Sequence, residues 1–448
     1  ASDVSAAIEG SDGFNEQLKK AAGGVSVTAT DTSSITAVAE AASMAGAVGG
    51  LGGAALSVGV SLSRNLIDSD VIATIANVGS TATVTEVGGN LSVSATNLSR
   101  IDAETSAASF AAGFGGLGGL AISGAGAEAR NTILGSTKAM VENSVLNVAG
   151  TIDVKARSEG TIDALITSES EAIAGGGLAG VGAAVGVSLA RNFIGLRQNT
   201  DHNYDYTLEN DPLSITKGER VYVDDGVRQG DIYEYVNDID LLREPNKSIL
   251  ASTDYGNPEL WKLVNRESAD SEVLAAVDNS QVTATGAVAI EAQSRQAINA
   301  RVTSSTSAFS VGGLGAASLS GSGSGATNAI NVDTIARVDG TAEAGTANIA
   351  NDALTADTLS ISAEDVSNIS SVVSASAVST AYTGGLGAAI SIGMSVAENT
   401  IEGDTEASIR DTAITTTSGD VDLTATRESI QGFSDSGFVD DYTATETK

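Results

Sequence analysis

Apolar and polar residues alternate along most of this chain, which is the pattern of β-strands that bury one face. The alternation starts afresh six times with related text: VSVTATD at 25, LSVSATN at 91, IDVKARS at 152, VAIEAQS at 288, LSISAED at 359 and VDLTATR at 421. Each opening has apolar residues at its first and third positions and an alanine at its fifth. We predict that each opening is a strand and that the six are structurally equivalent.

The openings recur at intervals of 66, 61, 136, 71 and 62 residues, so four intervals define a unit of 61–71 residues. The remaining interval is too long by about one unit, which predicts either a hidden copy or an insertion. Within each unit, short alternating segments are broken by Gly, Asp or Asn, as is typical of repetitive all-β folds. We therefore expect an all-β protein, a repetitive β-solenoid or β-helix, with two or three coils per unit if a coil takes about 20–30 residues.

A glycine-rich motif occurs in five units, as GGLGG at 49 and 115, GGLAG at 176, and GGLGA at 312 and 384. Glycine permits positive φ and close approach of two backbones, so each motif predicts a tight turn or a thin packing layer, with its leucine fastening the turn to the interior. An asparagine follows each leucine after 14 residues, or 13 in the last unit, which indicates fixed geometry. The predicted turn and ladder residues are Gly49, Gly50, Leu51, Gly115, Gly116, Leu117, Leu178, Leu314, Leu386, Asn65, Asn131, Asn192, Asn328 and Asn399. A phosphate-binding loop is rejected, because neither a helix nor a lysine is expected after any copy.

The segment after the glycines alternates as well. In AALSVGVSLSRN, Leu56, Val58, Val60 and Leu62 fall on one side, and Ser and Gly fall on the other. The preceding AVAEAASMAGAV is rich in alanine and is compatible with a helix, but its glycine and the absence of caps favour strands. We expect the repeats to stack as successive rungs around one narrow interior of small side chains.

Composition narrows the possible functions. The 448 residues are 42% hydrophobic but only 4% aromatic, so the interior is expected to be thin. The formal net charge of −33 makes nucleic-acid binding improbable, since phosphates require Lys and Arg. There is no cysteine, hence no disulfide, and no long apolar run that would span a membrane. The start of the chain does not resemble a signal peptide, so an export signal would lie outside this sequence.

Residues 196–270 differ abruptly from the rest and explain the long interval as an inserted small β domain. They hold all three prolines, the only His and Trp, and six of the eight tyrosines. The predicted division is a lead-in at 1–24, solenoid repeats at 25–195, the insertion at 196–270, further repeats at 271–435 and a tail or incomplete repeat at 436–448.

The insertion, with ITKGERVYVDDGVRQGDIYEYV followed by DYGNPELWKLV, is similar to small chitin-binding-type carbohydrate modules. That resemblance implies that Tyr233, Tyr235 and Trp261 stack on sugar rings. The alternative is that these rings form the core of the small domain, which needs bulky side chains to bury enough area.

We predict that the protein is not an enzyme and needs no cofactor. There is no cysteine nucleophile, and His202 lies in no catalytic motif. Carboxylates are plentiful, but the repeats have few of the aromatic and basic residues that line polysaccharide-cleaving grooves. Weak Ca²⁺ binding by Asp224, Asp225 and Asp231, or by 440–441, stays open beside the interpretation of a solvated acidic surface.

The recurring text GGLGGAALSVGVSLSRN with its strand openings resembles the giant repetitive surface proteins of Gram-negative bacteria, the filamentous-adhesin and leukotoxin-like group, over roughly residues 25–435. The resemblance implies an extracellular or cell-surface β-solenoid shaft that serves adhesion or filament formation. The expected partners are further copies of the chain, end to end or laterally, and surface glycans. The alternative is a carbohydrate-binding protein that acts through the insertion, with the repeats as a spacer.

Overall fold

The structure is a computed structural model that describes residues 2–10, 19–80, 84–198, 204–210, 212–223, 232–243, 247–253, 255, 257, 259–264, 266–268, 271–340, 352–430 and 443–446. Over these residues the secondary structure is entirely β, without a helix. Three large sheets, in which the repeats pair in parallel, account for most of the chain. We call them the front, back and end sheets.

The front sheet carries the six openings. Its strands are β3 (Val25–Asp31), β4 (Ser34–Gly49), β7 (Leu91–Gly115), β11 (Ile152–Gly176), β23 (Val288–Gly312), β27 (Leu359–Val366), β28 (Asn368–Thr383) and β32 (Val421–Ile430), with β33 (Thr443–Glu446) antiparallel to β32. The back sheet contains β1 (Ser2–Glu9), β5 (Gly52–Ala76), β8 (Gly118–Leu134), β9 (Thr137–Glu142), β12 (Ala179–Ile194), β21 (Glu272–Asp278), β24 (Gly315–Asn331), β25 (Asp333–Asp339), β29 (Leu386–Glu402) and β30 (Thr405–Arg410). The end sheet contains β2 (Lys20–Ala21), β6 (Thr85–Val87), β10 (Val145–Val148), β22 (Gln281–Ala284), β26 (Ala353–Ala356) and β31 (Ala413–Thr416).

One sequence unit makes one circuit through the three sheets. The chain runs along β7, turns at the glycine motif, returns along β8 and β9, crosses β10 and enters β11, which pairs with β7. The expectation of two or three coils per unit is therefore wrong. The reason is strand length, because β7 and β11 are each 25 residues long and a whole unit is used up in a single circuit.

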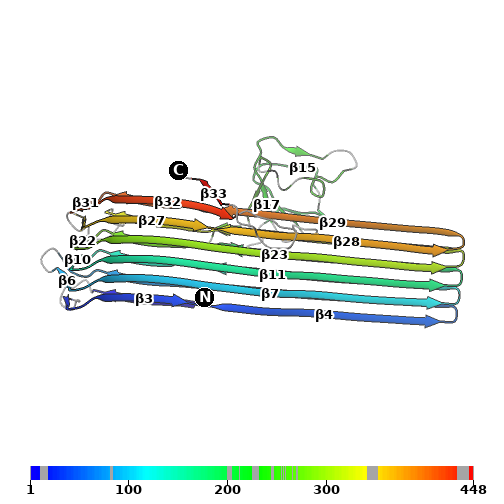
Figure 1. The fold of residues 1–448 in the computed structure, drawn as a ribbon. Helices are drawn as coiled ribbons and strands as arrows, with labels where there is room; N and C mark the ends of the chain where they lie inside the picture. Colours follow the sequence, from blue (N-terminus) through cyan, green and yellow to red (C-terminus); the bar gives the residue numbers. More distant parts are fainter. Residues whose placement is uncertain are drawn as a thin grey trace.

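Successive units pair in the register that the sequence intervals predict (Figure 1). Leu91 pairs with Ile152, Ile152 with Val288, and Val288 with Leu359. The predicted lead-in also belongs to the array, because β1 pairs in parallel with β5, from Ser2 beside Ser69 to Glu9 beside Ala76. VSAAIE at 4 is thus the counterpart of VIATIA at 71. This similarity is visible in the sequence, but our sequence analysis missed it.

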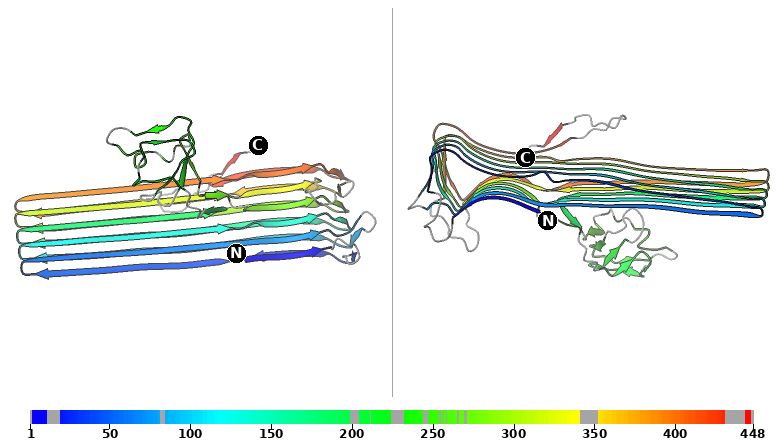
Figure 2. Two further views of the ribbon diagram at one scale, coloured as in Figure 1. Left: turned by 180° about the vertical axis from the view of Figure 1, so that it is seen from behind. Right: turned by 90° about the horizontal axis from the view of Figure 1, so that it is seen from below.

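Each circuit has a thick half and a thin half, and the view from below shows the front and back sheets drawing together toward the glycine turns (Figure 2). The thick half is filled by large residues such as Leu91, Ile101 and Ile152. The thin half, typified by residues 105–127, buries a separate cluster of alanines: Ala55, Ala111, Ala121, Ala172, Ala174, Ala184 and Ala308. The small-residue interior expected from composition therefore describes the thin half only.

Glycine sets the separation of the two sheets in the thin half. A Cβ added to Gly113 would lie 2.0 Å from the carbonyl oxygen of Leu120, and one added to Gly119 would lie 2.2 Å from that of Gly175. Real Cβ atoms do not approach backbone this closely, so only glycine allows the layers to meet.

The long interval is an insertion and not a hidden copy. The chain leaves the back sheet after β12 and rejoins it at β21, and antiparallel β13 (Leu196–Gln198) and β20 (Arg266–Ser268) form the base of the excursion. Its other strands are β14 (Tyr206–Thr207), β15 (Ser214–Ile215), β16 (Arg220–Tyr222), β17 (Ile232–Tyr235), β18 (Leu241–Leu242) and β19 (Trp261–Leu263). Strands β14, β16, β17 and β19 form one small sheet.

Candidate functional site

The glycine turns rely on close backbone approach and not on positive φ. A Cβ on Gly49 would lie 2.0 Å from the carbonyl oxygen of Gly52, and one on Gly115 would lie 2.0 Å from that of Gly118. The residues with positive φ lie elsewhere, among them Asn77, Asn143 and Asn279. Of the two reasons for glycine in the predicted turns, only the close approach applies.

The leucines of these turns do not fasten them to the interior, contrary to our prediction. Leu51 is 75% exposed and Leu386 87%, and the other three are exposed as well: Leu117, Leu178 and Leu314. The turns are held instead by backbone hydrogen bonds along the stack. The amide of Leu117 donates to the carbonyl of Leu51 at 2.9 Å, and the same bond recurs from Leu178, Leu314 and Leu386 to the preceding leucine. The interior between the layers is too thin to receive a leucine.

The five asparagines lie one above another and form a chain of amide hydrogen bonds. Asn65 Nδ2 donates to Asn131 Oδ1 at 2.8 Å, and the same 2.8 Å bond links Asn131 to Asn192, Asn192 to Asn328 and Asn328 to Asn399. The three central side chains are buried. The ladder therefore ties five circuits together at the junction of the thin and thick halves.

The alternation in the thin half is inverted relative to an ordinary soluble sheet. On β5, the apolar Leu56, Val58 and Val60 point outward and are exposed, whereas Ser57 and Ser61 are buried. The buried hydroxyls bond to one another across the layer, as Ser43 Oγ does with Ser57 Oγ at 2.7 Å. The exposed members of this outer surface, which we call the apolar face, are Leu56, Val58, Val60, Leu120, Ile122, Val181, Val185, Val187, Leu319, Ile390, Ile392 and Met394.

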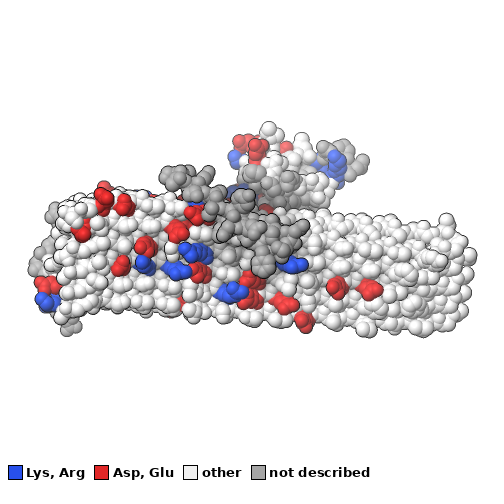
Figure 3. Space-filling model, in the orientation of Figure 1, with Lys and Arg blue, Asp and Glu red and all other residues white. Residues whose placement is uncertain are grey.

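The back sheet carries no charged residue in the thin half of any unit, and the front sheet carries few there, among them Glu169 and Glu171, which pair in register with Ala108 and Phe110. The stretches 41–63, 105–127, 172–190, 302–332 and 366–397 contain no Asp, Glu, Lys or Arg. On the front of the molecule, the charged side chains become sparse beyond the middle, and the outermost end, which has the glycine turns, carries none (Figure 3).

A groove crosses the outer surface of the front sheet where the two halves meet. Asp102 and Asp163 occupy the same register position on neighbouring strands and line this groove with Asn299. Arg100 Nη2 donates to Asp102 Oδ1 at 2.7 Å and to Asp163 Oδ2 at 2.6 Å. The hydrogen bond from Arg100 lowers the pKa of Asp102, which keeps that carboxylate ionised. We did not predict this cluster, although its sequence signal is the recurrence of Asp at equivalent positions.

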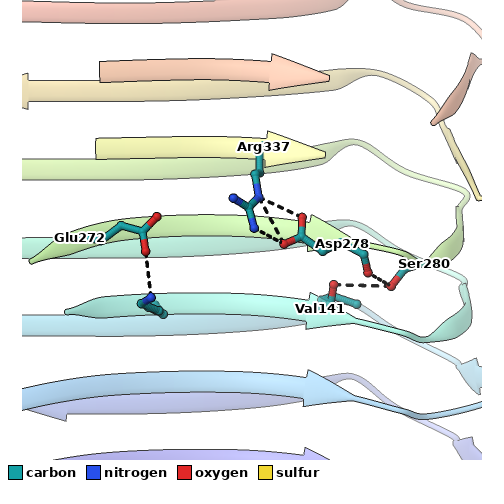
Figure 4. A network of polar contacts seen from close by, with 6 residues as sticks. Val141, Glu272, Asp278, Ser280 and Arg337 are labelled. Carbon is teal, nitrogen blue, oxygen red and sulfur yellow. Dashed lines mark hydrogen bonds and ion pairs between the residues drawn. The ribbon is translucent and has the colours of Figure 1, made fainter. Parts of the chain in front are cut away.

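The back sheet carries a second ionic network in the thick half (Figure 4). Arg337 Nη2 donates to Asp278 Oδ2 at 2.6 Å, and Lys138 Nζ pairs with Glu272 Oε2 at 2.8 Å. Burial raises the pKa of Asp278 despite the opposing effect of Arg337. These pairs connect the neighbouring strands β9, β21 and β25, so they tie successive circuits of the back sheet together.

The structure places the three proposed sugar-binding rings in the core of the inserted domain. Tyr233, Tyr235 and Trp261 are each about 3% exposed or less. Tyr235 packs edge-on against Trp261 with ring centroids 5.2 Å apart, and Trp261 Nε1 donates to Thr253 Oγ1 at 2.9 Å. A ring enclosed in this way has no face to offer a sugar, so the core alternative is the one that the structure supports.

One aromatic pair of the insertion does reach the surface. Tyr204 is 41% exposed and stacks on Tyr222, with ring centroids 5.1 Å apart. His202 and the acidic clusters at 224–225, 231 and 440–441 lie outside the described residues. Among the residues that are described, no group of three or more His, Cys, Asp or Glu side chains is placed to hold a metal ion.

Over the same part of the chain, no helix is long and apolar enough to cross a bilayer. Comparison with protein-family models, with curated proteins and with solved structures gives no match. The function of these surfaces is therefore inferred from the structure itself. That structure is an all-β array with parallel sheets, an inverted thin half and a small inserted domain.

Proposed function

We propose that this chain is an extracellular structural and adhesive segment of a bacterial surface, built as a β-solenoid with unusually wide coils. The observation that carries this proposal is the register of the repeats. From β3 to β32 the openings of six units pair in parallel along the front sheet, and buried asparagines link five circuits by side-chain bonds. Such an array can be extended by adding circuits without a new fold.

The proportions of a circuit suggest what the array is for. A unit of 61–71 residues adds only one strand spacing, about 4.8 Å, to the stack. A front strand of 25 residues, by contrast, extends about 80 Å. A chain of this kind gains little reach per residue, but it gains broad flat faces. We infer that the array provides a broad surface, as in a layer or a wide ribbon. A role in extending far from the point of attachment fits these proportions less well.

A non-enzymatic role is consistent with the polar groups on the array. The paired carboxylates of the front groove are both bound by Arg100, and Asn299 Nδ2 donates to Asp163 Oδ1 at 2.7 Å. Glycoside hydrolysis needs one protonated carboxyl group beside one ionised one. Arg100 donates to both carboxylates and lowers the pKa of Asp102, an arrangement that suits a structural pair.

The extracellular location is supported by the adhesin-like text of the repeats, by the absence of cysteine and by the net charge of −33. Carbohydrate binding through the insertion remains the second candidate. Its predicted rings are buried, so the observation that still favours it is the partly exposed Tyr204 stacked on Tyr222. A glycan array would reveal such binding, and its loss in Tyr204→Ala, with the fold of the insertion retained, would assign it to this pair.

Two measurements test the structural role. Electron micrographs of the purified protein should show slabs whose width matches about 25 extended residues, or ribbons built from them. Antibodies to the array should label intact cells that make it. Compact globular particles, or labelling only after the cells are permeabilised, would contradict the proposal.

A further inference from the structure

The apolar face is the feature of this molecule that its own fold does not account for. It lies on the outer side of β5, β8, β12, β24 and β29 in the thin half, and Val58 and Val60 are each 59% exposed there. Monomeric soluble proteins rarely expose continuous apolar patches larger than a few hundred Å². No charged residue interrupts the corresponding stretches of sequence.

The apolar face is not flat, because large side chains and glycines alternate from strand to strand. Along one register, Val58 lies beside Gly124, Gly124 beside Val185, Val185 beside Gly321 and Gly321 beside Ile392. The register two residues further alternates in the same way, in the order Val60, Gly126, Val187, Gly323 and Met394. In these two registers, β5, β12 and β29 are thus ridges, and β8 and β24 are grooves one strand wide. The register of Leu56 differs, because Ile122 of β8 and Leu319 of β24 flank Ala183 of β12 there, so the grooves are two residues long on the outer side of each strand.

The groove glycines have no intramolecular reason to be glycine. A Cβ on Gly126 or Gly321 would meet nothing within 4 Å, and one on Gly124 would meet only Val58 Cγ2 at 3.9 Å. This contrasts with Gly113 and Gly119, where a Cβ would collide with backbone inside the thin half. Glycine weakens a strand unless another group must approach closely, so the grooves point to contact from outside the chain.

We propose that the apolar face docks against the same face of a second copy, with the ridges of each copy seated in the glycine grooves of the other. A two-fold axis parallel to the strands reverses the strand order and allows a shift of one strand spacing, which brings ridge over groove. The Val185 and Val187 ridge of β12 then faces β8 or β24 of the other copy. The contact is self-complementary because grooves separate the ridges at the same one-strand interval on both copies.

The size of the face suits a stable dimer. After the shift of one strand spacing, four strands of each copy face each other, and four strands at about 4.8 Å and about ten residues at about 3.3 Å give roughly 630 Å² per copy, which lies at the lower end of the range for stable interfaces. The net charge of −33 opposes close approach of two copies. Since the apolar face carries none of that charge, it is the surface that two copies can bring together.

The inserted domain leaves room for this contact. Seen from behind, most of it lies beyond the last strands of the stack, so that the first strands of the back sheet stay open to approach (Figure 2). The proposed pairing makes a second copy of the chain the partner in the structural role proposed above. Only the biological purpose of the pairing depends on that role. Micrographs of slabs would stand even if the face did not dimerise.

Sedimentation equilibrium of the full chain over a range of concentrations tests the pairing. The decisive variant is the double substitution Gly126→Val and Gly321→Val, which fills both grooves. Valine favours strands, so the variant should fold. A second disruptive variant, Val185→Asp, puts a charge on the ridge. Its matched control is Ile173→Asp, which puts a charge at an outer position of β11 on the opposite sheet. The β signal in circular dichroism verifies folding in each case.

We expect the unchanged protein to dimerise, and both the filled-groove variant and Val185→Asp to raise the dissociation constant at least tenfold. Ile173→Asp should leave it unchanged. General hydrophobic adhesion predicts the reverse for the filled grooves, since added valines enlarge the apolar area. Equal or tighter association of that variant would overturn the proposal. A monomer at every concentration would also overturn it and leave the face to a different partner.

Discussion

Asn131 donates its side-chain amide to the Oδ1 atom of Asn192 at 2.8 Å, and both side chains are fully buried between the sheets. The two residues are 61 positions apart and belong to successive units of the repeat. Because the amide of Asn192 donates in turn to Asn328, each central asparagine is both donor and acceptor. A stack of amides of this kind fixes the register, since a shift of one residue would place a buried polar group without a partner.

Replacing Asn192 by alanine should therefore destabilise the array strongly. The change removes two buried hydrogen bonds and leaves the Nδ2 group of Asn131 and the Oδ1 atom of Asn328 unpaired. We expect a loss of about 2–5 kcal/mol in the free energy of unfolding, measured by urea denaturation. Asn65→Ala is the control, because Asn65 ends the ladder with one such bond and should lose about half as much. Equal effects of the two changes would contradict the ladder.

Alanine at Gly115 should destabilise the turn between β7 and β8. The added Cβ would lie 2.0 Å from the carbonyl oxygen of Gly118, so the turn has to open. We expect a loss of about 1–3 kcal/mol. Gly50→Ala is the matched control in the first turn, because a Cβ there meets nothing within 4 Å. Unfolding midpoints that fall equally for both would show that flexibility, and not close approach, selects glycine here.

Changing Asp365 to asparagine should increase the free energy of unfolding, and the increase should be larger at neutral pH than at acid pH. Burial raises the pKa of this carboxyl, although Ser367 Oγ donates to it at 2.7 Å and Arg427 Nε lies 3.4 Å away. A folded pKa above the unfolded one means that stability is present at low pH and is lost as the pH rises through the folded pKa. Asparagine carries no charge at any pH and keeps that stability.

The measurement is the unfolding free energy of both proteins from pH 3 to pH 8. The difference in favour of Asp365→Asn should grow with pH, whereas the exposed Asp422→Asn should follow the unchanged protein. Parallel curves for Asp365→Asn and the unchanged protein would show that the buried carboxyl does not titrate abnormally.

Trp261→Ala should unfold the inserted domain and leave the array intact. Trp261 packs against Tyr235 and Tyr255 in the core, and loss of a buried tryptophan costs about 3–5 kcal/mol. Limited proteolysis should then cut within 196–270 at much lower protease concentration. Tyr204→Ala, which trims a partly exposed ring, should change proteolysis little. A folded Trp261→Ala insertion would argue that the ring is not a core residue.

The sequence by itself determined the all-β class, the strand openings, their grouping into units and their register, but not the length of the strands or the single circuit per unit. The openings around Ala95, Ala156 and Ala292 repeat so closely that pairing them side by side follows from the intervals, and these residues are paired in the structure. The change of composition at 196–270 likewise marked the insertion. Local patterns suffice here because alternation, turn residues and repetition are properties of the chain, independent of what it packs against.

Only the tertiary structure decided which side of each strand faces inward in the thin half. Alternation gives two faces, and Val58 and Ser57 fit either assignment until the spacing of the sheets is known. In the thin half that spacing admits small residues such as Ser, Ala, Gly and Thr, so the valines and the turn leucines point outward. The same limit applies to Trp261, whose type suits a core and a sugar platform equally. Burial depends on what lies across the layer, which comes from strands tens of residues distant.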